Sequence, residues 1–147
     1  MADFQMLATG FQYDAWANLR WLECLEAKGF PQPETGIFEH ILSAGSVWYQ
    51  RCLGFSPLAF PEMELTREAI QIAADKWVAL MESLPEDRVV EYRRISGEPL
   101  STTLSEIVLH VLNHSTYHRG ELRGLCLLHA DEEFPETDRI LFSLTTS

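Results

Sequence analysis

Apolar residues recur at intervals of three and four along several long stretches of this chain, and this spacing limits the fold more than any other feature. The first stretch, about residues 3–28, has no proline and only one glycine, Gly10, before its end. Side chains at such intervals share one face of an α-helix. The stretch stops at Gly29, a residue type common after the last turn of a helix. We therefore expect a long amphipathic helix over about residues 3–28.

Two further helices are expected in the next part of the chain. One runs from about Gly36 to Leu53, where Gly54 ends the periodic stretch. The other begins after Thr66, whose hydroxyl can accept a hydrogen bond from a free backbone N–H of the first turn. It ends before Pro85, because proline cannot continue a helix.

The pattern changes before the last long helix. Val89, Val90, Tyr92 and Ile95 favour extended chain, and Ser96-Gly97 is a turn signal, so we expect an extended segment or a short hairpin over about residues 88–100. Thr103 followed by Glu106 matches a capping box, which predicts that a fourth helix begins there and runs over about residues 104–129. Residues 140–144 are apolar enough for a short docking helix or strand.

Four long amphipathic helices predict an all-α protein, and we expect an antiparallel four-helix bundle. The extended segment or hairpin lies between helices three and four. It is the longest of the expected connections and the one able to cross the bundle. The length of 147 residues is typical of one domain, so residues 1–147 are assigned to a single bundle domain.

The chain is strongly acidic, with 22 Asp and Glu against 11 Lys and Arg and a formal net charge of −11. This charge repels phosphate backbones and anionic lipid surfaces, so nucleic acids and membranes are not expected as partners. No run approaches the roughly 18 apolar residues of a membrane-spanning helix. The first residues also lack the basic and apolar segments of a secretion signal. We expect a cytoplasmic protein.

The segment HVLNHSTYHRGE, residues 110–121, is the strongest chemical feature of the sequence. On a helix, His114 and His118 lie one turn apart on one face, close enough to share a metal ion, and His110 lies a further turn back. Apolar residues occupy the same stripe, so we expect these histidines to point into the bundle. Buried imidazoles need partners. A metal ion is one solution, and a hydrogen-bonded histidine core with carboxylate partners is the other.

A metal site needs a further ligand, and His40 is the candidate. It lies early in the second expected helix among apolar neighbours, whereas His129 ends the fourth helix, where an imidazole suits the helix dipole. Three neutral imidazoles would leave positions open for water or substrate, which fits catalysis better than a closed structural site. Zinc or nickel is the expected ion, although iron, manganese and copper also accept such ligands.

Four segments that cover most of the chain resemble, in order, the segments of one known family. They are YDAWANLRWLECL (13–25), FEHILSAGSVWYQRCLG (38–54), RRISGEPLSTTLSEIVLHVLNH (93–114) and NHSTYHRGEL (113–122). They are similar to the first helix, the second helix with its ligand histidine, the linker into helix four and the helix-four signature of the DinB/YfiT-like family. These are small metal-binding bundles, unrelated to the DNA polymerase that shares the name.

The resemblance implies a four-helix bundle, often dimeric, in which three histidines hold a divalent metal ion. On this sequence those ligands are His40, His114 and His118. His110 matches a frequent family position outside the usual ligand set. It is assigned to the surroundings of the site or to core packing, with a fourth-ligand role as the alternative.

One residue departs from the family pattern. Members commonly carry Gln where this chain has Glu121, three residues after His118. The carboxylate can reach the metal ion, a ligand imidazole or Arg119, and a surface or interface ion pair is the other interpretation. Arg119 itself is expected to pair with a carboxylate. Glu121 is the only candidate for a catalytic base near the histidines.

The resemblance suggests a metal-dependent enzyme of the hydrolase or thiol-dependent S-transferase type, acting on a small-molecule substrate. A thiol cofactor belongs to the second type. One alternative is a non-catalytic metal-binding stress-response bundle. Another is a dimerisation module in which the histidines form a hydrogen-bonded core without metal. A homodimer is expected from the resemblance.

Overall fold

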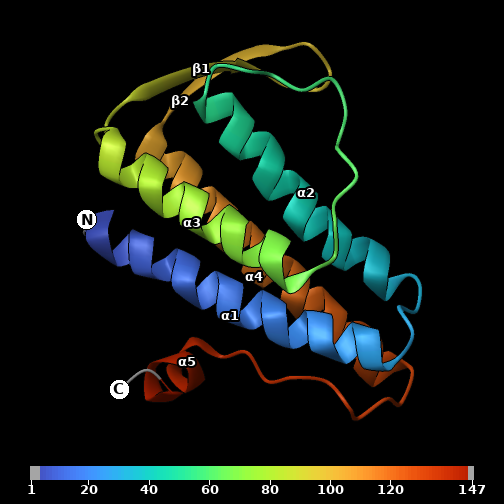
Figure 1. Cartoon of the computed structure of the whole chain (residues 1–147). Helices are drawn as coiled ribbons and strands as arrows, with labels where there is room; N and C mark the ends of the chain where they lie inside the picture. Colours follow the sequence, from blue (N-terminus) through green and yellow to red (C-terminus); the bar gives the residue numbers. More distant parts are fainter. Residues whose placement is uncertain (1–3, 146–147) are drawn as a thin grey trace.

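Helices make up most of the protein in the computed structural model, which describes residues 4–145 (Figure 1). These residues form five helices and one two-stranded sheet. In chain order the elements are α1 (Phe4–Ala27), α2 (Glu34–Cys52), α3 (Arg67–Ser83), β1 (Val89–Arg93), β2 (Pro99–Thr103), α4 (Leu104–Leu128) and α5 (Arg139–Thr145). The expected start of the first helix near residue 3 lies outside the described residues.

Two threonines begin helices as the sequence predicts. At the start of α3, Thr66 Oγ1 accepts a hydrogen bond from the backbone N–H of Ala69, with an N···O distance of 3.1 Å. At the start of α4, Thr103 Oγ1 accepts one from the backbone N–H of Glu106 at 3.4 Å. Each bond satisfies a first-turn donor that has no partner within its helix. Both predicted caps are confirmed.

α2 begins at Glu34, directly after Pro33 and two residues earlier than predicted. Proline is tolerated at this place because the first N–H groups of a helix have no intrahelical partner. At the other end, Gly54 has a φ of +94°, a left-handed conformation that glycine adopts without steric cost. The helix therefore ends where the sequence indicates.

The extended segment between α3 and α4 is an antiparallel hairpin, as predicted. Val89 pairs with Thr103 and Arg93 with Pro99, and Gly97 takes a φ of +94° in the turn. β2 runs directly into α4, because Thr103 is both its last residue and the helix cap. A helix cap has extended backbone, which explains why the strand passes the predicted limit at residue 100.

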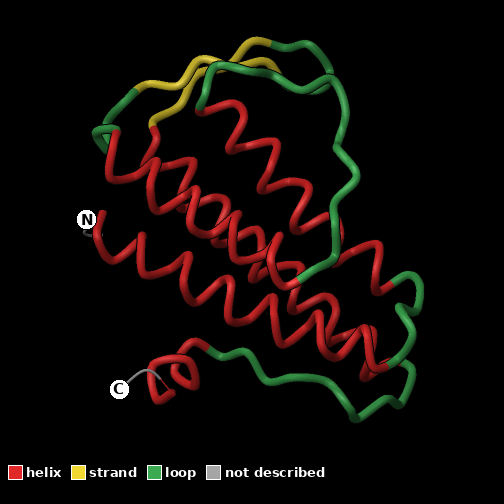
Figure 2. The backbone as a smooth tube through the Cα atoms, in the orientation of Figure 1, coloured by secondary structure: helices red, strands yellow, loops and turns green. Residues whose placement is uncertain are grey.

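The four long helices pack mainly as two pairs, α1 against α3 and α2 against α4 (Figure 1). Figure 2 shows the connection 53–66 returning from the end of α2 to the opposite end of the molecule, where α3 begins. α2 and α3 therefore run in the same direction. An extended residue spans about 3.3 Å and a helical one about 1.5 Å, so this connection is long enough to return. The chain crosses over here, and not in the hairpin segment.

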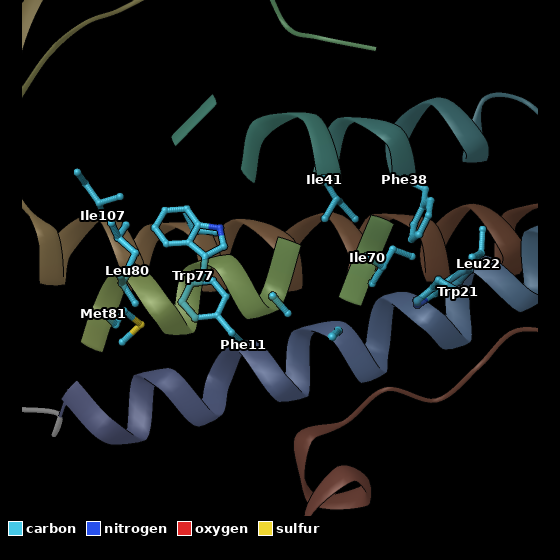
Figure 3. Close-up of a cluster of buried hydrophobic side chains, with 14 of the residues drawn as sticks. Phe11, Trp21, Leu22, Phe38, Ile41, Ile70, Trp77, Leu80, Met81 and Ile107 are labelled. Atoms are coloured by element: carbon cyan, nitrogen blue, oxygen red, sulfur yellow. The ribbon is translucent and has the colours of Figure 1, made fainter. Parts of the chain in front are cut away.

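The core lies between the helices and is rich in aromatic side chains. Phe11 of α1 stacks on Trp77 of α3 with ring centroids 5.1 Å apart. Figure 3 shows Phe38 and Ile41 of α2 directed toward the same interior as Trp21 of α1. Each large apolar side chain of this kind stabilises the fold by about 1.5–3 kcal/mol when fully buried. The largest with almost no exposed surface are Trp21, Phe11, Phe38, Leu22, Leu25 and Leu104.

After α4 the chain returns beside α1 and ends in α5 (Figure 1). Phe142 of α5 is buried, with its ring centroid 5.9 Å from that of Tyr13 and 5.7 Å from that of Trp16. The expected terminal docking element is thus a helix. None of the helices within residues 4–145 has the length and apolar character needed to cross a membrane.

Candidate metal centre

Three histidines from two helices meet where α2 packs against α4. His40 comes from α2, and His114 and His118 come from successive turns of α4. One ring nitrogen from each of the three lies within 4.8 Å of the others. Within residues 4–145, no other group of three or more His, Cys, Asp or Glu side chains has ligand atoms this close. The three ligands named from the sequence are therefore brought together.

Glu121 contacts the outer side of the His118 ring. Its Oε1 lies 2.9 Å from His118 Nδ1, one turn along the same helix. Because an ionised carboxylate only accepts hydrogen bonds, Nδ1 carries the proton, and Nε2 of a neutral ring keeps its lone pair. That Nε2 faces the Nε2 of His114 at 3.2 Å. Of the contacts expected for Glu121, the one with a ligand imidazole is present.

The cluster is half-buried, so the expectation that these histidines point into the interior is met only in part. His114 and His118 have intermediate exposure and His110 is exposed. Successive residues of a helix lie about 100° apart around its axis. The face of α4 that packs into the core therefore includes Ser115 and Arg119, the residues that directly follow His114 and His118. The residues of α4 that face the core are Leu104, Ile107, Val108, Val111, Ser115, Arg119, Leu122 and Cys126.

Burial keeps imidazoles of the cluster neutral. The pKa of His114 is lowered to about 4, first by burial and then by the neighbouring imidazoles. Burial also lowers the pKa of His40, and the nearby His118 acts in the same direction. A neutral imidazole offers the lone pair that a metal ion requires. These rings are therefore ready to act as ligands near neutral pH.

His110 borders the cluster without joining it. Its ring centroid lies 5.5 Å from that of His114 and 5.2 Å from that of Trp48. Partial desolvation of the ring, followed by the positive charge of Arg51, lowers the pKa of His110. The group of nitrogens within 4.8 Å does not include this residue. These contacts fit the expected role in the surroundings of the site.

His129 lies apart from the cluster, at the C-terminal end of α4. Its Nδ1 is 3.4 Å from Oε1 of Glu34, a buried carboxylate in the first turn of α2. This pair connects the ends of two helices. The structural role expected for His129 agrees with this contact.

Two exposed aromatic side chains flank the histidines. Phe60, from the connection 53–66, packs edge-on against His40 with ring centroids 5.3 Å apart, and is 52% exposed. Tyr117 stacks on His118 with centroids 5.1 Å apart, and is 68% exposed. Phe60 could not be predicted from the sequence, because a position in a non-periodic loop carries no signal that places it beside α2. Both rings give the cluster an apolar border.

Arg119 is the buried cation of α4. Its Nη1 donates to Asp14 Oδ1 at 2.6 Å and to Asn18 Oδ1 at 2.8 Å, and its side chain is only 3% exposed. Both acceptors belong to α1, so this network connects α1 to the helix that carries two of the three histidines. The expectation that Arg119 pairs with a carboxylate is confirmed. The partner Asp14 was not singled out from the sequence.

Three imidazoles, one of them held by a carboxylate, form a donor set that suits zinc, nickel or iron. No curated protein and no solved structure matches the chain. Residues 4–126 match the DinB family, and this range includes His40, both histidines of the cluster on α4 and Glu121. The chain belongs to the DinB family.

Proposed function

We propose that this protein binds one divalent metal ion through His40, His114 and His118 and is a metal-dependent enzyme acting on a small molecule. The convergence of three ligand nitrogens within 4.8 Å is the observation that carries the proposal. The hydrogen bond from His118 to Glu121 supports it, because ligating histidines usually donate their second N–H to such a partner. Zinc or nickel is the ion we expect.

The ion would supply Lewis acidity, which lowers the pKa of a bound water or thiol and polarises a carbonyl. Structural zinc sites usually have four protein ligands. Within residues 4–145 no fourth His, Cys, Asp or Glu joins the cluster, which favours an accessible site. The exposed rings of Phe60 and Tyr117 would contact the apolar part of a substrate that approaches from solvent.

We assign Glu121 to positioning His118, with a role as general base as the alternative. Its Oε1 accepts the hydrogen bond of His118 Nδ1, which is the contact that positioning requires, whereas a general base would need the other oxygen near the substrate. A carboxylate behind a ligating imidazole fixes the ring orientation and strengthens the ligand. Loss of turnover with metal retained in Glu121→Gln would favour the base, and weaker metal binding would favour positioning.

Elemental mass spectrometry on the untagged protein tests metal binding first. We expect a stoichiometric divalent ion that His114→Ala loses. His129→Ala is the matched control on the same helix, and it should retain the ion. Native protein without metal, and without uptake of added zinc or nickel, would contradict the proposal and favour a histidine core without metal.

Substrate screening separates the two reaction types. Metal-loaded protein is offered a panel of esters and amides, and in parallel a panel of electrophiles with several thiol cofactors. Turnover that requires the added thiol supports an S-transferase, and turnover without thiol supports a hydrolase. A metal-loaded protein that turns over neither panel would favour the non-catalytic metal-binding bundle.

We further propose that α1–α4 form a four-helix bundle built from antiparallel pairs, and that two copies associate as a homodimer. The packing of α1 on α3 and of α2 on α4 supports the first statement. The family resemblance and the exposed side chains of Leu127 and Leu128, near the end of α4, support the second. Light scattering on the purified protein should give twice the chain mass, and the chain mass alone would contradict the dimer.

A further inference from the structure

A cleft of about 440 Å³ lies between α1, α2 and α3, with Val111 and Ser115 of α4 at its base, and none of the three clustered histidines lines it. It exists because α3 packs chiefly against α1 and touches α2 only slightly. The connection 53–66 contributes residues 62–64 to its border. Clefts of this size hold small molecules in other proteins.

Small residues keep the cleft open on the side of α2 and α3. A Cβ atom placed on Gly45 would meet no other atom within 4 Å, so the space beside this residue is empty. Ser46, Ala69 and Ala73 also line the cleft. Protein interiors are otherwise close-packed, because an unfilled space loses stabilising contacts. The sequence therefore leaves room here that larger apolar residues would fill.

One wall of the cleft is aromatic. Phe11 stacks on Trp77 with centroids 5.1 Å apart, and Trp77 meets Tyr49 edge-on at 5.4 Å. The face of an aromatic ring attracts a positive charge. Lys76 already places its Nζ 6.0 Å from the centroid of Tyr49. Phe11 and Trp77 are almost fully buried, at 1% and 4% exposure, so Tyr49 is the ring of this wall whose face a cation can reach.

Carboxylates dominate the charged groups of the cleft. Asp14, Glu62, Glu64 and Glu68 line it, and Lys76 is the one basic residue among the lining residues. The Asp14 side chain is mostly buried, at 14% exposure, and Arg119 bonds its Oδ1. Its Oδ2 has a hydrogen bond of 3.4 Å from Asn18, so it can still accept a bond from a ligand.

We propose that this cleft binds a small organic cation, a protonated amine carried by a flat apolar body. The aromatic wall would contact the body and the adjacent charge, and the carboxylates would compensate that charge. An anion of the same shape would meet repulsion from these carboxylates. None of the three clustered histidines lines the cleft, so the proposal does not depend on the proposed metal function.

The amine 2-phenylethylamine is a suitable probe for the metal-free, full-length chain. The measurement is the NMR shift of the indole N–H of Trp77 during titration, with Trp77→Phe used to assign the signal. We expect a saturable shift and a dissociation constant roughly tenfold lower than those of 2-phenylethanol and phenylacetate, which share the ring but lack the positive charge. Equal affinity for all three probes would overturn the assignment to cations.

Two glycine variants test the location. Gly45→Leu places a side chain in the cleft, and Gly124→Leu adds the same side chain to a glycine of α4 that has open space and lies outside the cleft. Both replace a helical glycine by a better helix former, so both should fold. We expect Gly45→Leu to weaken amine binding roughly tenfold or more, and Gly124→Leu to leave it unchanged.

If Gly45→Leu does not fold, Ala73→Phe blocks the same cleft from α3. If a folded variant with this side chain in the cleft binds the amine with the affinity of the native protein, the proposed location is wrong. The double variant Glu64→Gln with Glu68→Gln should weaken binding, whereas the exposed Glu132→Gln should not. Binding should persist in His114→Ala, so a failure of the metal proposal and a failure of this one give different results.

Discussion

The hydrogen bond between Glu121 and His118 decides which nitrogen of the ring faces the cluster. With Nδ1 held at 2.9 Å by the carboxylate, Nε2 is the nitrogen directed at His114. Removing the carboxylate frees the ring to turn and to change tautomer. Glu121 thus acts on His118 from the side of the ring remote from the cluster.

We predict that Glu121→Ala weakens metal binding about 10- to 100-fold, the usual cost of losing such a partner. Glu121→Gln should lose less metal affinity, because its amide oxygen can still accept the hydrogen bond of His118. Competition with a chelator of known affinity gives the dissociation constants, and Glu132→Gln serves as a surface control. Native affinity in the alanine variant would mean that the contact with His118 does not matter for the ion.

The pair of Arg119 and Asp14 predicts a large effect on stability. Asp14→Ala leaves a guanidinium that is 3% exposed without its carboxylate, and breaking a buried pair in this way costs about 3–5 kcal/mol. Asn18 still accepts one bond, so we expect the lower end of this range. Urea unfolding measures the change.

The matched double variant, Asp14→Leu with Arg119→Met, removes both charges together. Replacing both partners of a buried ion pair by apolar groups can leave the free energy of unfolding nearly unchanged. The double variant should therefore recover most of the stability lost in Asp14→Ala. A single variant as stable as the native protein would show that the bond contributes little.

At the scale of elements, helix starts depend on single side chains. Thr66 and Thr103 each satisfy one first-turn donor. Thr66→Ala and Thr103→Ala should each lower the free energy of unfolding by about 1 kcal/mol. Thr9→Ala is the control, because Thr9 lies inside α1 and its hydroxyl bonds back to the Gln5 carbonyl oxygen. Chemical denaturation that shows equal stability for all three variants would contradict the capping argument.

The helices and the hairpin could be predicted because their signals are local. Periodic apolar residues, cap threonines and a glycine turn specify structure within a few residues of themselves. The path of the connection 53–66 could not be predicted in this way, because it depends on which helices pack together. The spacing of His114 and His118 placed them on one face of a helix. It did not determine how far that face is turned toward the core, because a shift of one residue rotates the buried face by about 100°.

The rest of the site depends on tertiary packing. His40 comes close to the other two histidines only because α2 packs on α4, and no local pattern predicts that contact apart from the family resemblance. Phe60 and Asp14 were missed for the same reason. Their partners lie on other elements, and neither residue belongs to a recognisable motif.

At the scale of the whole molecule, a bound ion would link the two helices of one pair. Saturating zinc should therefore stabilise the folded state by RT ln(1 + [L]/Kd), about 2.7 kcal/mol at a hundredfold excess over the dissociation constant. For a chain of this size, that corresponds to an increase in Tm of about 5–10 °C. Calorimetry with and without a chelator gives this difference. His114→Ala should show no such dependence, and a native Tm indifferent to zinc and chelator would contradict metal binding.

The connection 53–66, which returns from α2 to α3, contacts both the histidine cluster and the cleft. It places Phe60 against His40, and a few residues later it places Glu62 and Glu64 on the border of the cleft. A displacement of this one segment would change the surroundings of the histidines and the entrance of the cleft together. The histidine cluster and the cleft can thus influence each other through a loop, without any rearrangement of the helices.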